Sequence, residues 1–473
     1  MRYLLYVLIM VLLSGCGQTM LSQQERPDDL TFPPLEFHFP EVAQQRLESG
    51  AKLYLKEDHE LPLVNLTLLV EGGSVYDPQD KTGLSQFFAQ SLSTGGTANL
   101  TPQQLEVELE AMAAILTVSS SRYGYTIDLS LNRQDLQRGI EILGDLLHHP
   151  RFDSARMELV RSQMLENIHR KNDDPGSIAS RLLREAIYPD HPFGSDPTVT
   201  TVNSFTREDL LELHQRDFQP EHFWLAVSGD VEKSELVDLL NQQFANWPAT
   251  PSASLQLPPL PAAPAGKVIL ADKQIPQTTV LMGHPGISKD NPDVFALQVA
   301  NYILGGGGFN SRMMREVRSN RGLAYSVYSY FQVGRRLPGL FIVSSETKSQ
   351  STDEVVTLLK QLISQIREEP VSAAELELAK ESLINSFVFA FADSHSVVNR
   401  KVRLDYYGYP EDYLETYRQR IADVTIADVQ RVSQQYLHPD DLQIVLVGDS
   451  QVYRADIEKI GFPVEKVDLH ETP

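Results

Sequence analysis

Two side chains that could stabilise a negative charge follow a run of glycines in the second half of the chain. Arg318 and Tyr325 lie seven residues apart. A guanidinium and a phenol are both suitable hydrogen-bond donors to an oxygen that becomes negative during a reaction. The alternative is that Arg318 is a solvated helix residue and that Tyr325 is a core aromatic.

The glycines themselves suggest a place where another chain approaches the backbone. They are consecutive, at Gly305, Gly306, Gly307 and Gly308. Residues without a Cβ allow close approach and present bare N–H groups. A nucleotide site is not expected here, because no Gly-Lys-Ser or Gly-Lys-Thr follows and Asn310 breaks the Gly-x-Gly-x-x-Gly spacing.

Two glutamines share one face of a helix that is predicted near residues 83–97. The apolar residues of this stretch recur at helical spacing, at Leu84, Phe87, Phe88 and Leu92. Gln86 and Gln90 are four residues apart, so they lie one turn from each other, with Ala89 between them in sequence. Catalytic zinc sites use imidazole, thiolate or carboxylate ligands, and a neutral carboxamide is a poor substitute.

The layout of residues 83–97 closely resembles that of the peptidases of family M16, which includes pitrilysin, insulysin and the mitochondrial processing peptidase. There the same stretch carries His-x-x-Glu-His, whose two His bind zinc and whose Glu activates water. The three motif positions are occupied here by Gln86, Ala89 and Gln90. The spacing of the family places its third ligand, a Glu, at Asn167. Glu166 is adjacent, but one residue along a helix is a rotation of about 100°. The resemblance therefore implies that these positions hold no metal.

The same resemblance assigns a role to Arg318 and Tyr325. The second half of M16 subunits carries an Arg and a Tyr seven residues apart, which bind substrate and stabilise the oxyanion. The glycine run matches the substrate-contacting loop of the non-catalytic subunit of the processing peptidase, although it is shorter here. In two-subunit M16 peptidases, one chain supplies zinc and the other supplies the Arg/Tyr pair.

The resemblance thus implies a non-catalytic subunit that binds peptide substrates and pairs with an active M16 subunit whose zinc motif is intact. Zinc is expected in that partner and not in this chain. The alternative is a purely structural or peptide-binding pseudopeptidase of the cell envelope.

The N-terminus resembles that of a bacterial lipoprotein. Arg2 precedes the apolar run 3–13, which is too short to span a bilayer but suits the core of a signal peptide. The run leads into Leu-Ser-Gly-Cys16, which contains the single cysteine of the chain. We expect a signal peptide at 1–16, a lipid anchor at Cys16 and a tether at 17–35. Gly17 favours the outer membrane, with the protein facing the periplasm. The alternative is an ordinary cleaved signal with an incidental cysteine.

Composition and charge bound the remaining possibilities. With 473 residues, of which 42% are hydrophobic, the chain can form several domains with substantial cores. A net charge of −22 argues against a nucleic-acid-binding surface, which needs clustered Lys and Arg.

The body of the chain repeats itself on either side of a proline-rich stretch. Six prolines lie within residues 248–266, which predicts a semi-rigid linker. The strand predicted at 64–70, with a helix after it, has a counterpart at 278–282, with a helix at about 292–304. Each half closes on an apolar strand that ends in Gly-Asp, and these glycines, Gly229 and Gly448, are 219 residues apart. So long a repeat indicates duplicated domains, at 36–247 and 267–466.

Strands mixed with long amphipathic helices predict an α/β or α+β architecture in each half. The M16 resemblance, which includes the segment His191-Pro192-Phe193-Gly194, extends over nearly the whole body. It implies two homologous domains, each a mainly antiparallel sheet packed with long helices.

Overall fold

The computed structural model describes residues 38–245, 247 and 255–469. The predicted signal peptide at 1–16, Cys16 and the tether at 17–35 lie outside the described residues. The described residues from 39 to 469 belong to one compact unit. Within the described part of the chain, no helix combines the length and the apolar character that a membrane crossing requires.

The first half is built on a six-stranded sheet with the order β1-β2-β6-β3-β5-β4. Its strands are β1 (Ala43–Arg46), β2 (Lys52–Glu57), β3 (Leu63–Glu71), β4 (Ile115–Ser120), β5 (Gly124–Asn132) and β6 (Phe223–Gly229). Neighbouring strands are antiparallel except β2 and β6, which are parallel. The central strand β3 is apolar along most of its length and buried on both faces, because helices cover both sides of the sheet.

The second half repeats this order as β12-β7-β11-β8-β10-β9. The strands are β7 (Lys267–Asp272), β8 (Gln277–Pro285), β9 (Ala324–Gln332), β10 (Leu340–Lys348), β11 (Gln443–Gly448) and β12 (Val464–Val467). One position differs between the halves. β12 comes from the end of the chain and runs parallel to β7, whereas β1 runs antiparallel to β2. The predicted fold class, two homologous and mainly antiparallel α/β domains, is confirmed.

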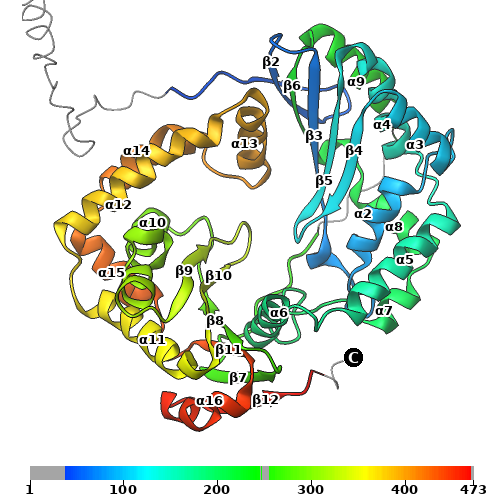
Figure 1. Cartoon of the computed structure of the whole chain (residues 1–473). Helices are drawn as coiled ribbons and strands as arrows, with labels where there is room; N and C mark the ends of the chain where they lie inside the picture. The colour runs from blue at the N-terminus through cyan, green and yellow to red at the C-terminus, as the bar shows by residue number, and fades with distance from the viewer. Residues whose placement is uncertain (1–37, 246, 248–254, 470–473) are drawn as a thin grey trace, which may run out of the picture. The chain divides into compact units, whose positions relative to one another are not determined.

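Long helices surround both sheets (Figure 1). The first half contributes α2 (Leu84–Thr94), α3 (Pro102–Ala111), α4 (Leu136–His148), α5 (Ser154–His169), α6 (Pro175–Ile187), α7 (Val199–Ser204), α8 (Arg207–Asp217) and α9 (Lys233–Phe244). The second half contributes α10 (Val294–Asn301), α11 (Thr352–Glu368), α12 (Ala373–Ser386), α13 (Ser394–Tyr406), α14 (Tyr413–Ala422), α15 (Ile426–Tyr436) and α16 (Ser450–Ile457).

The helix predicted to reach residue 304 ends earlier as an α-helix. α10 stops at Asn301, and a π-helical turn continues over Tyr302–Gly306. The Gly307 N–H donates to the Tyr302 carbonyl at 2.9 Å, which closes this wider turn. The correction has a physical cause, since consecutive glycines do not sustain a regular α-helix.

Each half sends one helix to the sheet of the other half. α6 packs on β11 and β8, and α13 packs on β6 and β2. Ile178, Leu182 and Leu183 of α6 share a buried cluster with apolar residues of the second sheet. Val398 and Val402 of α13 do the same on the first sheet. The described part of the predicted linker, residues 255–266, contains neither helix nor strand.

Candidate functional site

A buried carboxylate fixes the start of α2, the helix that carries the two glutamines. Asp77 accepts hydrogen bonds from the backbone N–H groups of Gly83 and Ser85, both at 3.1 Å. Gly83 precedes the helix in the left-handed conformation, with φ of +95°. The Ser85 hydroxyl donates to the same carboxylate at 2.5 Å. The carboxylate thus satisfies N–H groups that have no partner within the helix.

Burial alters the electrostatics beneath this helix. Desolvation raises the pKa of Asp77 to about 6, although hydrogen bonds from Ser85 and Gly83 oppose the shift. Asp217 is also buried and its pKa is raised mainly by desolvation, against an ion pair with Arg216 at 2.6 Å. The Tyr125 hydroxyl lies between the two carboxylates. It is 3.3 Å from Asp217 Oδ2 and 3.1 Å from Ser85 Oγ, and the Ser85 hydroxyl donates in turn to Asp77.

The three motif positions of α2 line one cavity of about 430 Å³, which we call the amide pocket. Gln86, Ala89 and Gln90 form part of its wall, and the end of the edge strand β4 with Arg122 forms another part. Gln86 also lines an adjoining cavity of about 320 Å³, and Asn167 lies in that cavity with it. The structure therefore gathers all four positions around Gln86.

These residues do not fit a zinc ion. The four positions supply carboxamides and a methyl group, and zinc needs imidazole, thiolate or carboxylate. Glu166, the nearest acidic neighbour of Asn167 in sequence, is exposed and pairs with Arg170 at 2.5 Å. Over the residues that the structure describes, no group of three His, Cys, Asp or Glu side chains is arranged to hold a metal ion.

One polar atom of the amide pocket lacks a partner. Gln90 Oε1 is buried and accepts no hydrogen bond from any described residue. Leaving such an acceptor unsatisfied costs about 1–3 kcal/mol. This oxygen has almost no accessible surface, so it faces the protein interior and not the open pocket.

In the second half, a glycine turn brings Arg318 and Tyr325 together. Arg318 lies in a π-helical segment, Met314–Asn320, and Tyr325 lies at the start of β9. Between them, Gly322 adopts the left-handed conformation with φ of +63°, and its N–H donates to the Arg318 carbonyl at 3.0 Å. The chain reverses at this point, which places residues seven apart side by side.

The Arg318 guanidinium lies between two exposed rings. Its Cζ is 4.4 Å from the ring centroid of Tyr325 and 4.7 Å from that of Phe309. Tyr325 is 80% exposed, so the alternative of a core aromatic is wrong. The rings engage the faces of the guanidinium. Its N–H groups make no hydrogen bond or ion pair within the part of the chain that the structure describes, so they can donate to a ligand.

Three of the four glycines are explained by packing inside the domain. A Cβ on Gly305 would lie 2.6 Å from the Ser329 backbone nitrogen, and Cβ atoms on Gly306 and Gly307 would approach Asn301 and Tyr302 equally closely. Gly308 alone has open space, with a left-handed φ of +56°, and Phe309 beside it is 66% exposed. Of the four glycines, only Gly308 therefore leaves room for a side chain or for an approaching ligand.

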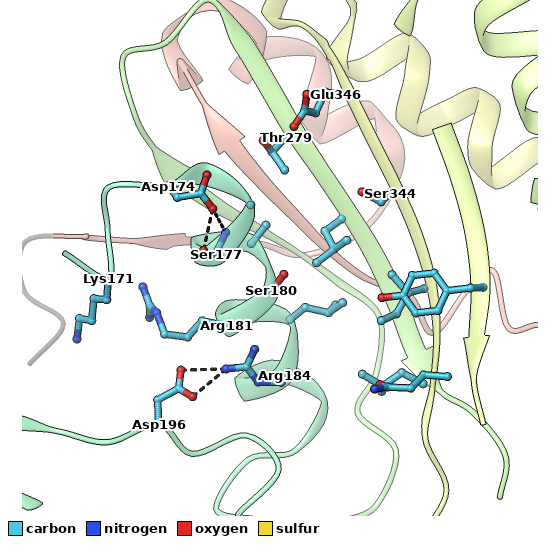
Figure 2. Close-up of a pocket in the computed structure, with 18 of the residues that line it drawn as sticks. Lys171, Asp174, Ser177, Ser180, Arg181, Arg184, Asp196, Thr279, Ser344 and Glu346 are labelled. Atoms are coloured by element: carbon cyan, nitrogen blue, oxygen red, sulfur yellow. Dashed lines mark hydrogen bonds and ion pairs between the residues drawn. The ribbon is translucent and has the colours of Figure 1, made fainter. Parts of the chain in front are cut away.

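A larger cavity lies where α6 meets the second sheet, and we call it the α6 cleft. Its volume is about 880 Å³. Figure 2 shows Arg181 and Arg184 of α6 on one side, and Thr279, Ser344 and Glu346 of the strands on the other. Arg184 pairs with Asp196 at 2.8 Å. Sequence reasoning missed this cleft, because its walls come from opposite halves of the chain.

Asn167 and Arg122 also line the α6 cleft, so it adjoins the amide pocket. Sequence reasoning passed over Arg122 as well, since a lone arginine after a strand carries no pattern. Arg318 and Tyr325 are not among the lining residues of the amide pocket or the α6 cleft.

Two protein-family models match successive parts of the chain. The model described as "Insulinase (Peptidase family M16)" matches residues 52–200. The model described as "Peptidase M16 inactive domain" matches residues 204–383.

Individual relatives agree with these models. A protein named an uncharacterized zinc protease of Mycobacterium leprae is 28% identical over 369 residues, which is 74% of this chain and 79% of the relative. A protein named a non-peptidase homolog of Helicobacter pylori is 25% identical over 414 residues, which is 86% of this chain and 94% of the relative.

Solved structures share the fold. A peptidase M16 inactive domain from Pseudomonas fluorescens matches with a TM-score of 0.79 and 24% identity, over 87% of this chain and 98% of that chain. A protease from Helicobacter pylori matches with a TM-score of 0.76 and 17% identity, over 87% of this chain and all of that chain. Since models of one family match both halves and solved members share the architecture, the chain belongs to peptidase family M16, with amide and methyl groups where the family's zinc motif would stand.

Proposed function

We propose that this chain is a non-catalytic subunit of an M16-type zinc metallopeptidase. It binds peptide substrates and contributes Arg318 and Tyr325 to an active site whose metal and general base come from a partner chain. The observation that carries the proposal is the exposed Arg318–Tyr325 pair in a chain whose own zinc positions hold no metal ligand. The name of the Helicobacter pylori relative, a non-peptidase homolog, supports it.

In this proposal, Arg318 and Tyr325 act as hydrogen-bond donors to the carbonyl oxygen of the scissile peptide bond. The two neighbouring rings restrict the positions that the guanidinium can take, which favours its presentation to a substrate. The exposed Tyr325 hydroxyl provides a second donor. Donors fixed in advance stabilise the developing negative oxygen without a reorganisation cost.

The test uses this chain reconstituted with an M16 partner that has an intact His-x-x-Glu-His motif. Arg318→Ala or Tyr325→Phe should lower kcat by about 10²–10³-fold. Assembly and the zinc content of the pair should stay unchanged. Arg315→Ala, in the same helical segment, is the matched control and should retain turnover. Unchanged turnover in the Arg318 and Tyr325 variants, or chelator-sensitive hydrolysis by the isolated chain, would contradict the proposal.

A second candidate function is peptide binding without catalysis nearby. The observation that favours it is that Gln86 and Gln90 line a pocket beside the edge strand β4. An extended peptide paired with β4 would present N–H groups close to the amides. If so, Gln86→Ala with Gln90→Ala weakens peptide binding by the isolated chain, whereas the Arg318 and Tyr325 variants do not affect turnover of any assembly.

We further propose that acyl chains on Cys16 anchor the protein to the outer membrane, with its body facing the periplasm. Several acyl chains on one residue give stable anchoring. Cys16→Ser should abolish incorporation of labelled palmitate and move the protein to the soluble periplasmic fraction. Retention of the variant in washed membranes would refute the anchor.

A further inference from the structure

A third cavity has an unusual charge for so acidic a protein. We call it the basic pocket, and its volume is about 660 Å³. Among the described residues that line it there are four cations and no Asp or Glu; the cations are Arg122, Lys289, Arg335 and Arg400. The chain as a whole carries a net charge of −22. A local excess of positive charge against this background indicates a site for an anion.

Arg122, from the first half, and Arg400, from the second half, form no ion pair with any carboxylate of the described residues. Asp196 acts on Arg122 only as a nearby charge. Arg122 lies with its Cζ 4.4 Å from the Phe193 ring centroid, and burial is the main cause that lowers its pKa. Arg400 lies on α13 and is exposed. Partial burial of Arg122 without a directly paired carboxylate is unfavourable, and an anionic ligand would offset that cost.

The other two cations leave the pocket positive. Arg335 donates to the Tyr409 hydroxyl at 2.7 Å and lies 5.3 Å from the Tyr407 ring centroid. Lys289 pairs with the exposed Asp290 at 2.5 Å and also donates to a backbone carbonyl. Neutral phenols cannot cancel the charge of Arg335, and the Asp290 carboxylate neutralises at most one of the four cations.

The aromatic side chains and the size of the pocket favour a peptide over a small inorganic anion as the ligand. Phe193, Phe331 and several tyrosines contribute rings to the wall. A cavity of about 300–1,000 Å³ accommodates a ligand of several residues' size. A small inorganic anion would leave these rings without contacts, whereas a peptide would use both the rings and the cations.

Arg122 connects the basic pocket to the rest of the site. It lines the basic pocket, the amide pocket and the α6 cleft, so the three cavities adjoin at this residue. A peptide held beside Gln86 and Gln90 can therefore extend toward Arg122 and into the basic pocket.

We propose that the basic pocket binds the carboxylates of an acidic peptide through Arg122 and Arg400, so that peptides with acidic segments are the class this chain selects. Arginine is suited to this role, since its fork of N–H donors matches a carboxylate. The inference rests on the proposed function in one respect, namely that the ligand is a peptide.

The test measures peptide binding to the purified chain by fluorescence anisotropy at low ionic strength. Three labelled peptides of equal length differ only in whether the same positions carry Glu, Gln or Lys. The Glu peptide should bind about tenfold or more tightly than the Gln peptide, and the Lys peptide should bind most weakly. Added salt should reduce the preference, because salt screens the charges.

Matched variants distinguish an effect of the two pocket arginines on peptide binding from an effect of the protein's net charge. Arg122→Gln with Arg400→Gln should bring the Glu and Gln affinities to within about threefold of each other. Arg151→Gln with Lys348→Gln removes the same charge at two exposed positions outside the pocket, and should keep the preference. Thermal melts of both variants check folding, and Arg122→Lys with Arg400→Lys should retain part of the preference.

The outcomes distinguish this inference from the proposed function. Equal binding of the three peptides would overturn the acidic preference and leave peptide binding intact. Absence of binding by every peptide would overturn both. Loss of the preference in the control variant, or its persistence in the pocket variant, would show that the basic pocket is not the site.

Discussion

At the scale of single residues, the degenerate metal site keeps polar groups but removes the charges and the nitrogen lone pairs that zinc requires. Gln86, Gln90 and Asn167 stand on the helices that would present ligands, and Gln86 shares a cavity with Asn167. A metal site depends on the ligand atoms and on the scaffold that presents them. In this chain the scaffold is present without the ligands.

Restoring the ligands should therefore restore metal binding. Gln86→His, Gln90→His and Asn167→Glu together should retain about one zinc per chain after dialysis, since three protein ligands suffice for a catalytic zinc site. Gln90→His alone is the control and should retain almost none. Elemental analysis provides the measurement. A wild-type chain that retains stoichiometric zinc would show that the amides bind metal after all.

A second residue-scale prediction concerns the buried Asp77. Its pKa is raised from 3.8 to about 6 by burial, so the folded state binds this proton more tightly than the unfolded state. The resulting stabilisation is complete below the unfolded pKa and is lost as the pH rises through 6. The wild-type unfolding free energy, relative to Asp77→Asn, should fall by about 2 kcal/mol between about pH 4 and pH 7. Urea denaturation at several pH values measures this, and a difference independent of pH would exclude it.

At the scale of elements, the segment from the end of α10 to the glycine run packs closely against β9. Asn301 and Ser329 exchange hydrogen bonds at 2.8 and 3.0 Å across this contact. Gly305 packs against the same serine. These contacts position β9, and β9 carries Tyr325 near its start. A glycine that looks like a ligand contact in the sequence is thus also a packing requirement.

Gly305→Ala should destabilise the protein by about 1–3 kcal/mol, because the new methyl group overlaps Ser329. Gly176→Ala is a matched control in the first turn of α6, where the nearest atom to the added Cβ is at 3.4 Å and φ is not positive. That change should be neutral or stabilise by up to about 1 kcal/mol. In thermal or urea melts, the two substitutions are expected to change the stability in opposite directions. Equal changes in stability would argue against the packing explanation.

At the scale of the whole molecule, the two halves share their cores. Leu182 and Leu183 of α6 are buried with Ile269, Leu281 and Val445 of the second sheet. α13 makes the reciprocal contact with the first sheet. The duplicated sequence suggests two independent domains. However, each half taken alone would lack a helix that covers its sheet in the intact chain, because that helix belongs to the other half.

The second half expressed alone, as residues 255–473, should therefore expose an apolar face that α6 normally covers. We expect strong binding of a hydrophobic dye and no cooperative melt for this polypeptide. Adding residues 38–247 in trans should suppress the dye signal, and the intact chain should unfold in a single calorimetric transition. Independent, sharp melting of each half would contradict this view of the fold.

Much of the fold and part of the site could be predicted from local patterns. The strand at residues 64–70 and the fold class follow from hydrophobic periodicity and from the repeat. The loss of the zinc motif follows from reading Gln86, Ala89 and Gln90 against the family. The helix expected to reach residue 304 does extend that far, but its last turn is a π-helix and not an α-helix.

The sequence by itself determined which ligand types are missing at the motif positions, and it predicted Arg318 and Tyr325 as donors. Residue types and the seven-residue spacing do not depend on distant contacts. Only the tertiary structure decided that Arg122 and Arg400 line one pocket, and that Arg122 also lines the pocket of Gln86 and Gln90. The reason is physical. A local pattern reports how a segment folds on itself, whereas a pocket forms where α13 and the loop after β4 meet, and that meeting is set by the packing of the whole core.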